Sequence, residues 1–451
     1  MKVLHTLKIA SLLCAVLLQA VNSVAQPVIK VASSAEADHS LFLKSDGSLW
    51  GMGRNDSGQL GDGTYNITNC PVLIVASNVT AIAAGRWHSL FLKSDGSLWA
   101  MGGDIAGQLG DGHHYPDPST NRPEMIVASN VMAIAAGAYH SMFVKSDGSL
   151  WAMGDNTYGQ LGDGTYNHAK LPEMIVASNV TVIAAGVYHS LFVKSDGSLW
   201  GMGYNGDGEL GDGTYGITNR PEMIVASNVT AIAAGSYHSL FVKCDGSLWS
   251  MGYNIFGQLG DGTYNNRTNF PEQIVASNVT AIAAGDEHSL FVKCDGSLWD
   301  MGQNADGELG DGTDNGTNYP EQIVAGNVTG IAGGCLYSLF VKSDGSLWGM
   351  GFDSWGELGD GPGNDANCPE QIVASPPGYN QISIGLLSGS NVNLSFVGMA
   401  GTNYELDRSY SLSPASWVPQ ITNPAGAGGV LVFTNTPDPT TNNFWRIRSV
   451  P

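Results

Sequence analysis

The chain has 451 residues, of which 13% are charged, and its net charge is −21. The length allows two or three ordinary domains, or one large repeat domain with a small companion. The acidity argues against nucleic acid or an anionic membrane surface as a partner, since both require clustered Lys and Arg. Of the 19 Lys and Arg residues, seven are one lysine repeated at a regular spacing.

Residues 1–25 have the layout of a secretory signal peptide. Lys2 and Lys8 make a basic start, residues 9–20 are mostly apolar, and "SVA" ending at Ala25 is a small-x-small cleavage site. We therefore expect an exported protein, located outside the cell, on its surface or in the periplasm. Removal of the two lysines would change the net charge from −21 to −23. No later segment approaches the roughly 18 apolar residues of a membrane span, so we expect no membrane insertion.

Residues 26–375 contain seven copies of one unit of about fifty residues. Each unit holds four short segments, exemplified by "VTAIAAG", "HSLFVK", "SLWGMG" and "EMIVAS", and none has helical periodicity. The "SDGS" between the second and third segments is a hairpin signal. Four antiparallel strands in each of seven units predict an all-β, seven-bladed β-propeller. A solenoid is the alternative, but it would need atypical polar caps at both ends. The units are marked by Trp50, Trp99, Trp151, Trp200, Trp249, Trp299 and Trp348.

The two ends of the repeat region suggest how the ring closes. The first unit begins at "VIKVAS" and is read as lacking its own Pro-led "IVAS" strand, while "QIVAS" at 371–375 follows the last unit as a spare. We expect residues 371–375 to complete the first blade, because closure removes exposed strand edges. The Ala-rich "AIAAG" segment is predicted to occupy the crowded inner position of each blade.

The repeated string "HSLFVKSDGSLWGMGxNxxGQLGDGT" resembles the repeat of the regulator of chromosome condensation (RCC1) family. The resemblance covers about residues 27–375 and implies a seven-bladed propeller. It implies little about function, because this fold serves as exchange factor, inhibitor, ligase partner and adhesin. Nucleotide exchange on a nuclear GTPase conflicts with export and with the acidic charge.

The repeat stops after residue 375. Residues 376–380 are predicted to be a linker, and residues 381–451 a small C-terminal β-domain. Alternating segments such as "NVNLSFVG" and "NYELDRSYSL" favour a β-sandwich-like fold, similar to terminal β-domains of bacterial secreted proteins. We expect this domain to fold independently of the propeller.

One face of the predicted ring varies between copies and the other does not. Consecutive loops of an antiparallel meander alternate sides, so the nearly invariant "SDGS" and "ASNV" turns share one face. The two residues before each His and the long loop after each "GMG" share the opposite face. Exposed loop aromatics are typical of protein interfaces and sugar sites, although such rings can instead pack between blades. The predicted binding residues are Trp87, Tyr139, Tyr188, Tyr237, Tyr158, Tyr204, Tyr253, Phe256, Phe352 and Trp355.

The repeated polar residues are interpreted as structural. One His per blade is too widely spaced to share a metal with ligand distances near 2.1 Å, so each His is expected to bond to backbone at a strand start. The "GDG" aspartates fit turn chemistry, and five cysteines without a CxxC pattern are expected to be free thiols. The six histidines are His39, His88, His140, His189, His238 and His288, with Tyr337 in the seventh place.

These patterns predict a secreted, non-catalytic, monomeric binding protein whose partner is a protein or a carbohydrate. No cofactor, metal site or catalytic motif is predicted. A more specific version is an inhibitor similar to the seven-bladed β-lactamase inhibitory protein, which shares the architecture. The alternative is an enzyme with its site at the propeller channel, which acidic residues converging at one channel mouth would favour.

Overall fold

The computed structural model describes residues 26–113, 119–361 and 363–376 and, further on, the segments 383–386, 392–398, 403–409, 418–424, 430–435 and 444–450. It divides into two compact units, of which one is Val28–Ser375 and the other includes Pro376–Pro451. The predicted signal peptide and most of the predicted linker lie outside the described residues. Among those residues, no helix is long and apolar enough to cross a membrane.

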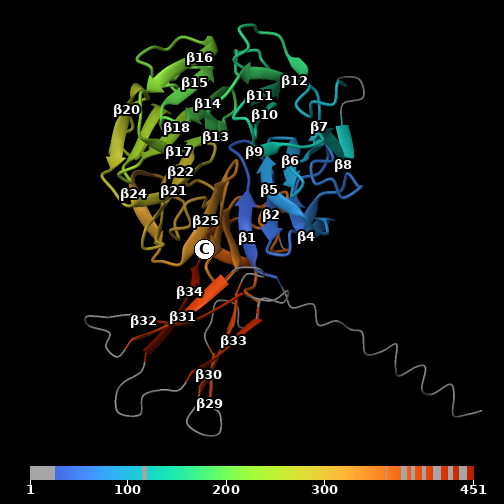
Figure 1. Cartoon of the computed structure of the whole chain (residues 1–451). Coiled ribbons are helices and arrows are strands. Elements are labelled where there is room, and N and C mark those ends of the chain that lie inside the picture. The colour runs from blue at the N-terminus through green and yellow to red at the C-terminus, as the bar shows by residue number, and fades with distance from the viewer. Residues whose placement is uncertain are drawn as a thin grey trace, which may run out of the picture. The chain divides into compact units, whose positions relative to one another are not determined.

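Val28–Ser375 forms seven four-stranded antiparallel sheets, which confirms the predicted seven-bladed propeller (Figure 1). Blade 1 is β1 (Val28–Ala32), β2 (His39–Lys44), β3 (Leu49–Gly53) and β4 (Thr68–Val75); blade 2 is β5 (Val79–Ala84), β6 (His88–Lys93), β7 (Leu98–Gly103) and β8 (Ser119–Val127); blade 3 is β9 (Val131–Ala136), β10 (His140–Lys145), β11 (Leu150–Gly154) and β12 (Ala169–Val176). Blade 4 is β13 (Val180–Ala185), β14 (His189–Lys194), β15 (Leu199–Gly203) and β16 (Thr218–Val225); blade 5 is β17 (Val229–Ala234), β18 (His238–Lys243), β19 (Leu248–Tyr253) and β20 (Arg267–Val275). Blade 6 is β21 (Val279–Ala284), β22 (His288–Lys293), β23 (Leu298–Gly302) and β24 (Thr317–Val324); blade 7 is β25 (Val328–Gly333), β26 (Tyr337–Lys342), β27 (Leu347–Gly351) and β28 (Ala366–Val373).

The "SDGS" hairpin turn is stabilised by a chain of side-chain contacts that explains why its letters do not change. In blade 1, Asp46 Oδ1 accepts hydrogen bonds from the backbone N (2.9 Å) and the Oγ (2.6 Å) of Ser48. The Ser48 Oγ in turn accepts one from Trp50 Nε1 (2.9 Å), and Lys44 Nζ lies 4.2 Å from the centroid of that indole. Gly47 adopts φ +77°, which favours glycine. All seven blades repeat this arrangement, which fixes one face of the ring.

The "ASNV" turn joins each blade to the next. Asn78 adopts φ +69°, a left-handed conformation that Asn tolerates better than most residues. Its position allows Val79 N, at the start of blade 2, to donate to Gly47 O in the hairpin of blade 1 (3.0 Å). A Cβ on Gly47 would lie 2.7 Å from Asn78 N, so the close approach of the two turns also requires glycine there.

A hydrogen-bonded belt of buried histidine and serine side chains runs between the blades. His39 Nε2 lies 2.7 Å from the Oγ of Ser89 in the next blade, and that hydroxyl donates to Gln59 O (2.8 Å). Because the serine proton is engaged, the histidine must be the donor, which leaves Nδ1 unprotonated. Burial lowers the pKa of His39 to about 3, so the ring stays neutral. The expectation that each His bonds to backbone is therefore wrong, since its partner is the serine of the following blade.

Equivalent His–Ser bonds link the other consecutive blades up to blade 7. The pairs after the first are His88–Ser141, His140–Ser190, His189–Ser239, His238–Ser289 and His288–Ser338, at 2.8 to 2.9 Å.

The ring closes by the same contacts that join the other blades. Val28 N donates to Gly345 O in the hairpin of blade 7 (3.0 Å), as Val79 does to Gly47. Tyr337 stands where the other blades have His, and its longer side chain reaches the carbonyl oxygen of His39 with a 2.8 Å hydrogen bond. Apolar side chains of the two blades also pack together, including Val28 from β1 and Leu347 from β27.

The prediction that residues 371–375 complete the first blade is wrong. β28 pairs with β27 inside blade 7, and blade 1 has its own fourth strand, β4, which contains Pro71. "VIKVA" is the inner strand β1 of blade 1, so each blade consists of four consecutive strands. The error came from treating this segment as lacking an outer strand, although "CPVLIVAS" at 70–77 supplies it.

The seven inner strands surround a narrow central channel of about 210 Å³. Its wall is built mostly from the "AIAA" segments, with Ala84, Ala136, Ala185, Ala234 and Ala284 among the lining residues. The small alanine side chain lets seven strands approach the axis together, which confirms the predicted inner position of this segment.

The described part of the C-terminal unit consists of two three-stranded sheets. One has the order β29 (Ser383–Leu386), β30 (Val392–Val397), β33 (Val430–Asn435), and the other β32 (Val418–Pro424), β31 (Asn403–Ser409), β34 (Phe444–Val450). Leu394 and Phe433 from the first sheet share a buried apolar cluster with Tyr404 and Leu406 from the second. Two sheets around one core agree with the predicted β-sandwich-like fold.

Replacing Tyr337 with Phe should weaken the closing junction. The substitution removes the hydroxyl that donates to His39 O and leaves a buried carbonyl without that partner, so it should lower the free energy of unfolding by about 1–3 kcal/mol. Chemical denaturation would measure the change, with Tyr166→Phe on an exposed loop as the control. Equal stability of the Tyr337→Phe variant and the parent would show that this bond does not help to close the ring.

Candidate functional site

The variable loops lie together on one face of the propeller. The loop before each His and the long loop after each "GMG" are joined by backbone bonds, such as Gly103 N to Trp87 O (2.7 Å) and Tyr204 N to Tyr188 O (2.9 Å). The invariant turns are joined to one another at the other ends of the strands, as Val79 N is to Gly47 O. The predicted separation into a fixed face and a variable face is confirmed.

Six of the predicted aromatic residues form a continuous arc over blades 3, 4 and 5. Tyr188 has its ring centroid 4.9 Å from that of Tyr158 and 6.3 Å from that of Tyr237. Tyr204 bridges the same neighbours at 5.2 and 6.2 Å. The arc continues from Tyr237 through Tyr253 to Phe256 at centroid distances of 6.2 and 6.4 Å. All six side chains are half-buried, so the rings support one another while each leaves a part exposed.

Trp87 and Tyr139 make a second aromatic contact, with centroids 5.4 Å apart in an edge-to-face arrangement. The Arg86 guanidinium lies over both rings, its Cζ 5.0 Å from the Trp87 centroid and 5.6 Å from that of Tyr139. Arg86 also forms an ion pair with Glu36 of the first blade. The sequence pattern marked the two rings but not the charged pair beside them.

Phe352 and Trp355 lie apart from the arc, in blade 7. The Trp355 ring, 37% exposed, packs under the guanidinium of Arg54 with Cζ 5.0 Å from its centroid. Phe352 is half-buried, and its backbone N donates to Leu336 O (2.9 Å). These two residues share the face but not the cluster of the other predicted residues.

Acidic residues converge at the channel mouth on this face. The first loop, residues 33–38, is longer than its counterparts, and its Ala35 packs against Ala138 and Val187 of blades 3 and 4. Burial raises the pKa of Asp286 to about 6 and that of Glu287 to about 7, the latter helped by the charge of Asp286. The sequence analysis missed this loop, although six residues, 33–38, separate its two strands and only three, 85–87, separate the equivalent strands of blade 2.

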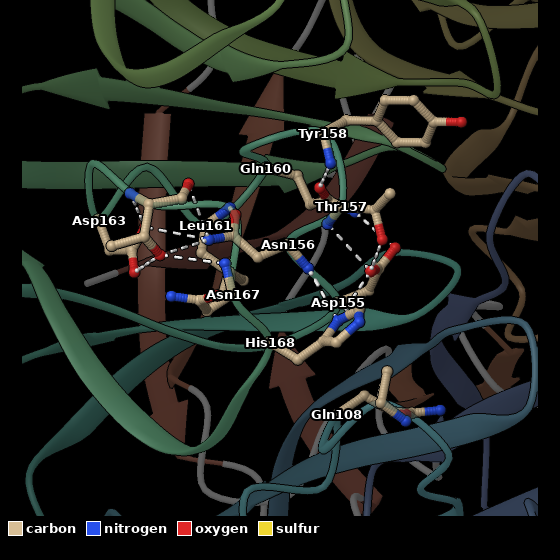
Figure 2. Close-up of polar contacts among 12 residues, drawn as sticks. Gln108, Asp155, Asn156, Thr157, Tyr158, Gln160, Leu161, Asp163, Asn167 and His168 are labelled. Atoms are coloured by element: carbon tan, nitrogen blue, oxygen red, sulfur yellow. Dashed lines mark hydrogen bonds and ion pairs between the residues drawn. The ribbon is translucent and has the colours of Figure 1, made fainter.

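A pocket of about 420 Å³ opens on this face between blades 2, 3 and 4. Tyr139, Tyr158 and Tyr188 line it together with Asp155 and His168. Figure 2 shows Asp155 at the centre of a polar network within the long loop between β11 and β12.

The Asp155 carboxylate is held by three neighbouring side chains. Its Oδ1 accepts from Thr157 Oγ1 (2.6 Å) and lies 2.9 Å from His168 Nδ1, while its Oδ2 accepts from Gln160 Nε2 (2.8 Å). The side chain of Asp155 is 10% exposed. These contacts fix the orientation of a carboxylate at the wall of an aromatic pocket. The repeat pattern could have drawn attention to it, because blade 3 has an acid where the other blades have Arg54, Gly103, Tyr204, Tyr253, Gln303 and Phe352.

The residue before the Leu of each "LGDG" string is Gln in four blades and Glu in three. Gln160 Oε1 accepts from Tyr158 N (2.9 Å), and Glu209 Oε2 accepts equivalently from Asp207 N (3.0 Å). Burial raises the pKa of Glu209 to about 8, of Glu308 to about 7 and of Glu357 to about 8. The second oxygen of each of these carboxyls is buried without a hydrogen-bond partner among the described residues.

The repeated "GDG" aspartates are turn residues, as predicted. Asp62 Oδ1 accepts from Thr64 N (2.8 Å) and from Asn55 Nδ2 (3.2 Å). Within the part of the chain that the structure describes, no group of three or more His, Cys, Asp or Glu side chains could hold a metal ion. The five cysteines among the described residues are free thiols, as predicted.

Exposed tyrosines of the "GDGTY" loops escaped the sequence analysis. They occur in four blades and are 44–55% exposed, more than most of the predicted residues. Their repetition made them look like part of the fixed framework. They are Tyr65, Tyr166, Tyr215 and Tyr264.

Comparison with protein families identifies the repeat. The model of the RCC1-like domain matches residues 16–225, and models of the regulator of chromosome condensation (RCC1) repeat match residues 229–258, 245–292, 279–308 and 295–341. The chain belongs to the RCC1 repeat family. The resemblance expected from the repeated string is confirmed.

Among RCC1 relatives, the chain is 30% identical to mouse protein RCC2 over 135 residues, which are 29% of this chain and 26% of RCC2. It is 28% identical to human E3 ubiquitin-protein ligase HERC2 over 143 residues, which are 31% of this chain and 3% of HERC2. The match thus spans about a quarter of RCC2 and a very small part of HERC2.

Solved RCC1-type structures share the propeller fold. Human WBSCR16 superposes with a TM-score of 0.63 at 24% identity over 70% of this chain and 87% of that chain. Yeast RCC1 (Prp20) superposes with a TM-score of 0.66 at 21% identity over 80% of this chain and 87% of that chain.

Replacing Glu209, Glu308 and Glu357 with Gln should stabilise the RCC1-type propeller at alkaline pH. In the folded state these carboxyls stay protonated up to about pH 7–8, whereas the unfolded chain ionises them above about 4.5. Their contribution to stability is therefore complete below pH 4.5 and is lost as the pH rises.

The triple variant should match the parent at pH 4.5 and exceed it at pH 8.5, by about 1 kcal/mol or more per site. Urea denaturation at the two pH values would measure this, with the exposed Glu173→Gln as the control. A parent whose stability does not fall between pH 4.5 and 8.5 relative to the triple variant would contradict the assignment.

Proposed function

We propose that this protein is an exported, non-catalytic binding protein that captures a protein partner on its variable loop face. The observation that carries the proposal is the aromatic arc, in which six half-buried rings from three blades support one another on one face. Rings fixed in this way lose little conformational entropy on binding, and aromatic residues are enriched among interface hot spots. The propeller supplies a rigid base for them.

Two further points support a binding role. One solved relative, yeast RCC1 (Prp20), is seen bound to another protein, Kap60. The basic start, apolar run and "SVA" of residues 1–25 support export. A monomeric inhibitor that presents the same loop face, similar to the propeller-type β-lactamase inhibitory protein, is a specific form of this proposal. A carbohydrate remains the other class of partner that clustered tyrosines suit.

The second candidate is an enzyme with its site at the channel mouth, which the convergence of Glu36, Asp286 and Glu287 favours. Two observations count against it. Glu36 is already paired with Arg86, and the loop containing Ala35 packs across the mouth. Hydrolytic turnover that is lost in Glu287→Gln but kept when the aromatic arc is removed would favour this candidate over the binding role.

Truncating the centre of the arc should abolish partner capture without unfolding the propeller. Replacing Tyr188, Tyr204 and Tyr237 with Ala removes rings that touch one another on an exposed face, and each truncation should cost about 2 kcal/mol or more of binding free energy. Partners captured from host extracts would be identified by mass spectrometry, and the affinity of the purified partner measured by calorimetry.

The control for this experiment is a variant of the fixed face. Cys244→Ser with Cys294→Ser places the residue of the other five repeats in two exposed hairpin turns, so it should leave both folding and capture unchanged. If the arc variant melts like the parent and binds the same partner with unchanged affinity, the variable face is not the binding surface.

A further inference from the structure

The pocket between blades 2, 3 and 4 combines aromatic rings with a carboxylate. Its walls include Tyr139, Tyr158 and Tyr188, and Asp155 lies beside them. No Lys or Arg is among the lining residues. Asp155 accepts hydrogen bonds from the Thr157 backbone and hydroxyl and from the Gln160 amide, and its Oδ1 lies 2.9 Å from His168 Nδ1, which accepts from Asn156 N (3.3 Å). The hydroxyl and amide donors carry no charge, so they orient the carboxylate without neutralising it.

On the same face, three arginine side chains each contact an aromatic ring and a carboxylate. Arg86 lies over Trp87 and pairs with Glu36. Arg54 lies 5.0 Å from the Trp355 centroid and 3.0 Å from Asp38. In each case one guanidinium contacts both an aromatic ring and a carboxylate, a combination that cation–π attraction and ion pairing favour.

The third example lies in the long loop of blade 4 and the outer strand of blade 5. Arg267 Cζ is 4.4 Å from the Tyr215 centroid, and its Nη1 is 3.5 Å from Asp207. The pocket beside Asp155 repeats this chemistry with more rings, but its lining contains no Lys or Arg. Its volume of about 420 Å³ can admit a whole side chain.

The charge of the face points to the same type of ligand. The described short and long loops contain many more carboxylates than cations, and their two arginines, Arg54 and Arg86, are ion-paired. The seven repeated lysines instead lie over the tryptophans beside the opposite turns, for example Lys243 at 4.0 Å from the Trp249 ring. A negative field at the mouth of a pocket raises the local concentration of cationic ligands.

We propose that this pocket, with Tyr139, Tyr158, Tyr188 and Asp155, accepts an arginine or lysine side chain from a basic segment of the protein partner. The inference rests on the proposed function and adds the chemistry of the partner. The tyrosine rings supply π faces for the cation and for its aliphatic stem, and Asp155 supplies the counter-charge.

The test uses the full chain and a fluorescein-labelled nona-arginine peptide, with nona-glutamate and a neutral oligosaccharide, cellohexaose, as comparison ligands. Fluorescence anisotropy at a fixed salt concentration measures the peptides, and calorimetry measures the sugar. Tyr158→Leu keeps most of the apolar area but removes a π face, so it should weaken nona-arginine binding about fivefold. Asp155→Asn should weaken it at least tenfold.

Matched controls separate the pocket from the general acidity of the face. Asp306→Asn removes one charge from the loops of blade 6, and it should change the affinity less than twofold at the same salt concentration. Equal weakening by Asp155→Asn and Asp306→Asn would overturn the proposal in favour of a diffuse charge effect. Because Asp155 also holds its loop together, Tyr158→Leu decides the matter if Asp155→Asn melts earlier than the parent.

The remaining outcomes distinguish the cation pocket from a sugar site and from the proposed binding face as a whole. Binding of cellohexaose that is tighter than that of nona-arginine and unaffected by Asp155→Asn would overturn the proposal in favour of a sugar site. If truncation of the aromatic arc abolishes partner capture but Tyr158→Leu and Asp155→Asn leave both capture and nona-arginine binding unchanged, the binding face stands and the cation pocket fails. If the pocket variants lose nona-arginine binding but the arc variant still captures the partner, the cation pocket stands and the proposed binding face fails.

Discussion

The structure depends on one buried hydrogen-bond relay between consecutive blades. The Nε2–H of a histidine donates to the serine hydroxyl of the next blade, and that hydroxyl donates to a carbonyl oxygen below the long loop, as in the set His39, Ser89 and Gln59. The relay needs a neutral ring with one fixed tautomer, and complete burial supplies it by lowering the pKa of the histidine. The relay therefore connects the position of each long loop to the register of two neighbouring blades.

The face opposite the variable loops explains why those loops are free to vary. Each hairpin turn there is held by the contacts of Asp46, Ser48, Trp50 and Lys44 or their equivalents, and each "ASNV" turn is bonded to the preceding hairpin. With both turns fixed, the strands emerge on the other face at set positions whatever the loops contain. Aromatic side chains from blades 3, 4 and 5 can then meet as one arc, although they are about fifty residues apart in the sequence.

The sequence repeat allowed the fold to be predicted, whereas features that differ between the copies were not predicted. Seven copies of a four-strand pattern predicted the blades, the alternating faces and the alanine-lined channel, because each follows from local periodicity and strand direction. The junction between blades 7 and 1 was misjudged, since residues 70–77 were not recognised as the outer strand of blade 1. The partners of His39 and of Asp155 lie in other blades or across a loop, and no spacing in the chain encodes those contacts. The pocket also depends on how the rings of Tyr139, Tyr158 and Tyr188 turn, which periodicity does not specify.

A ring of similar junctions also tolerates unequal blades. When each unit contacts mainly its neighbours, stability is close to a sum of unit and junction contributions, so an imperfect junction removes only a small part of the total. Blade 7 uses Tyr337 in place of histidine, and three blades bury a glutamate where four have glutamine. The buried histidines lower the free energy of unfolding as the pH falls below about 6.5, because their side chains take up protons more readily in the unfolded chain. The buried glutamates lower it as the pH rises above about 4.5, because their side chains ionise more readily in the unfolded chain. These opposite dependences place the most stable range between acid and alkaline limits, and they arise from the framework rather than from the variable loops.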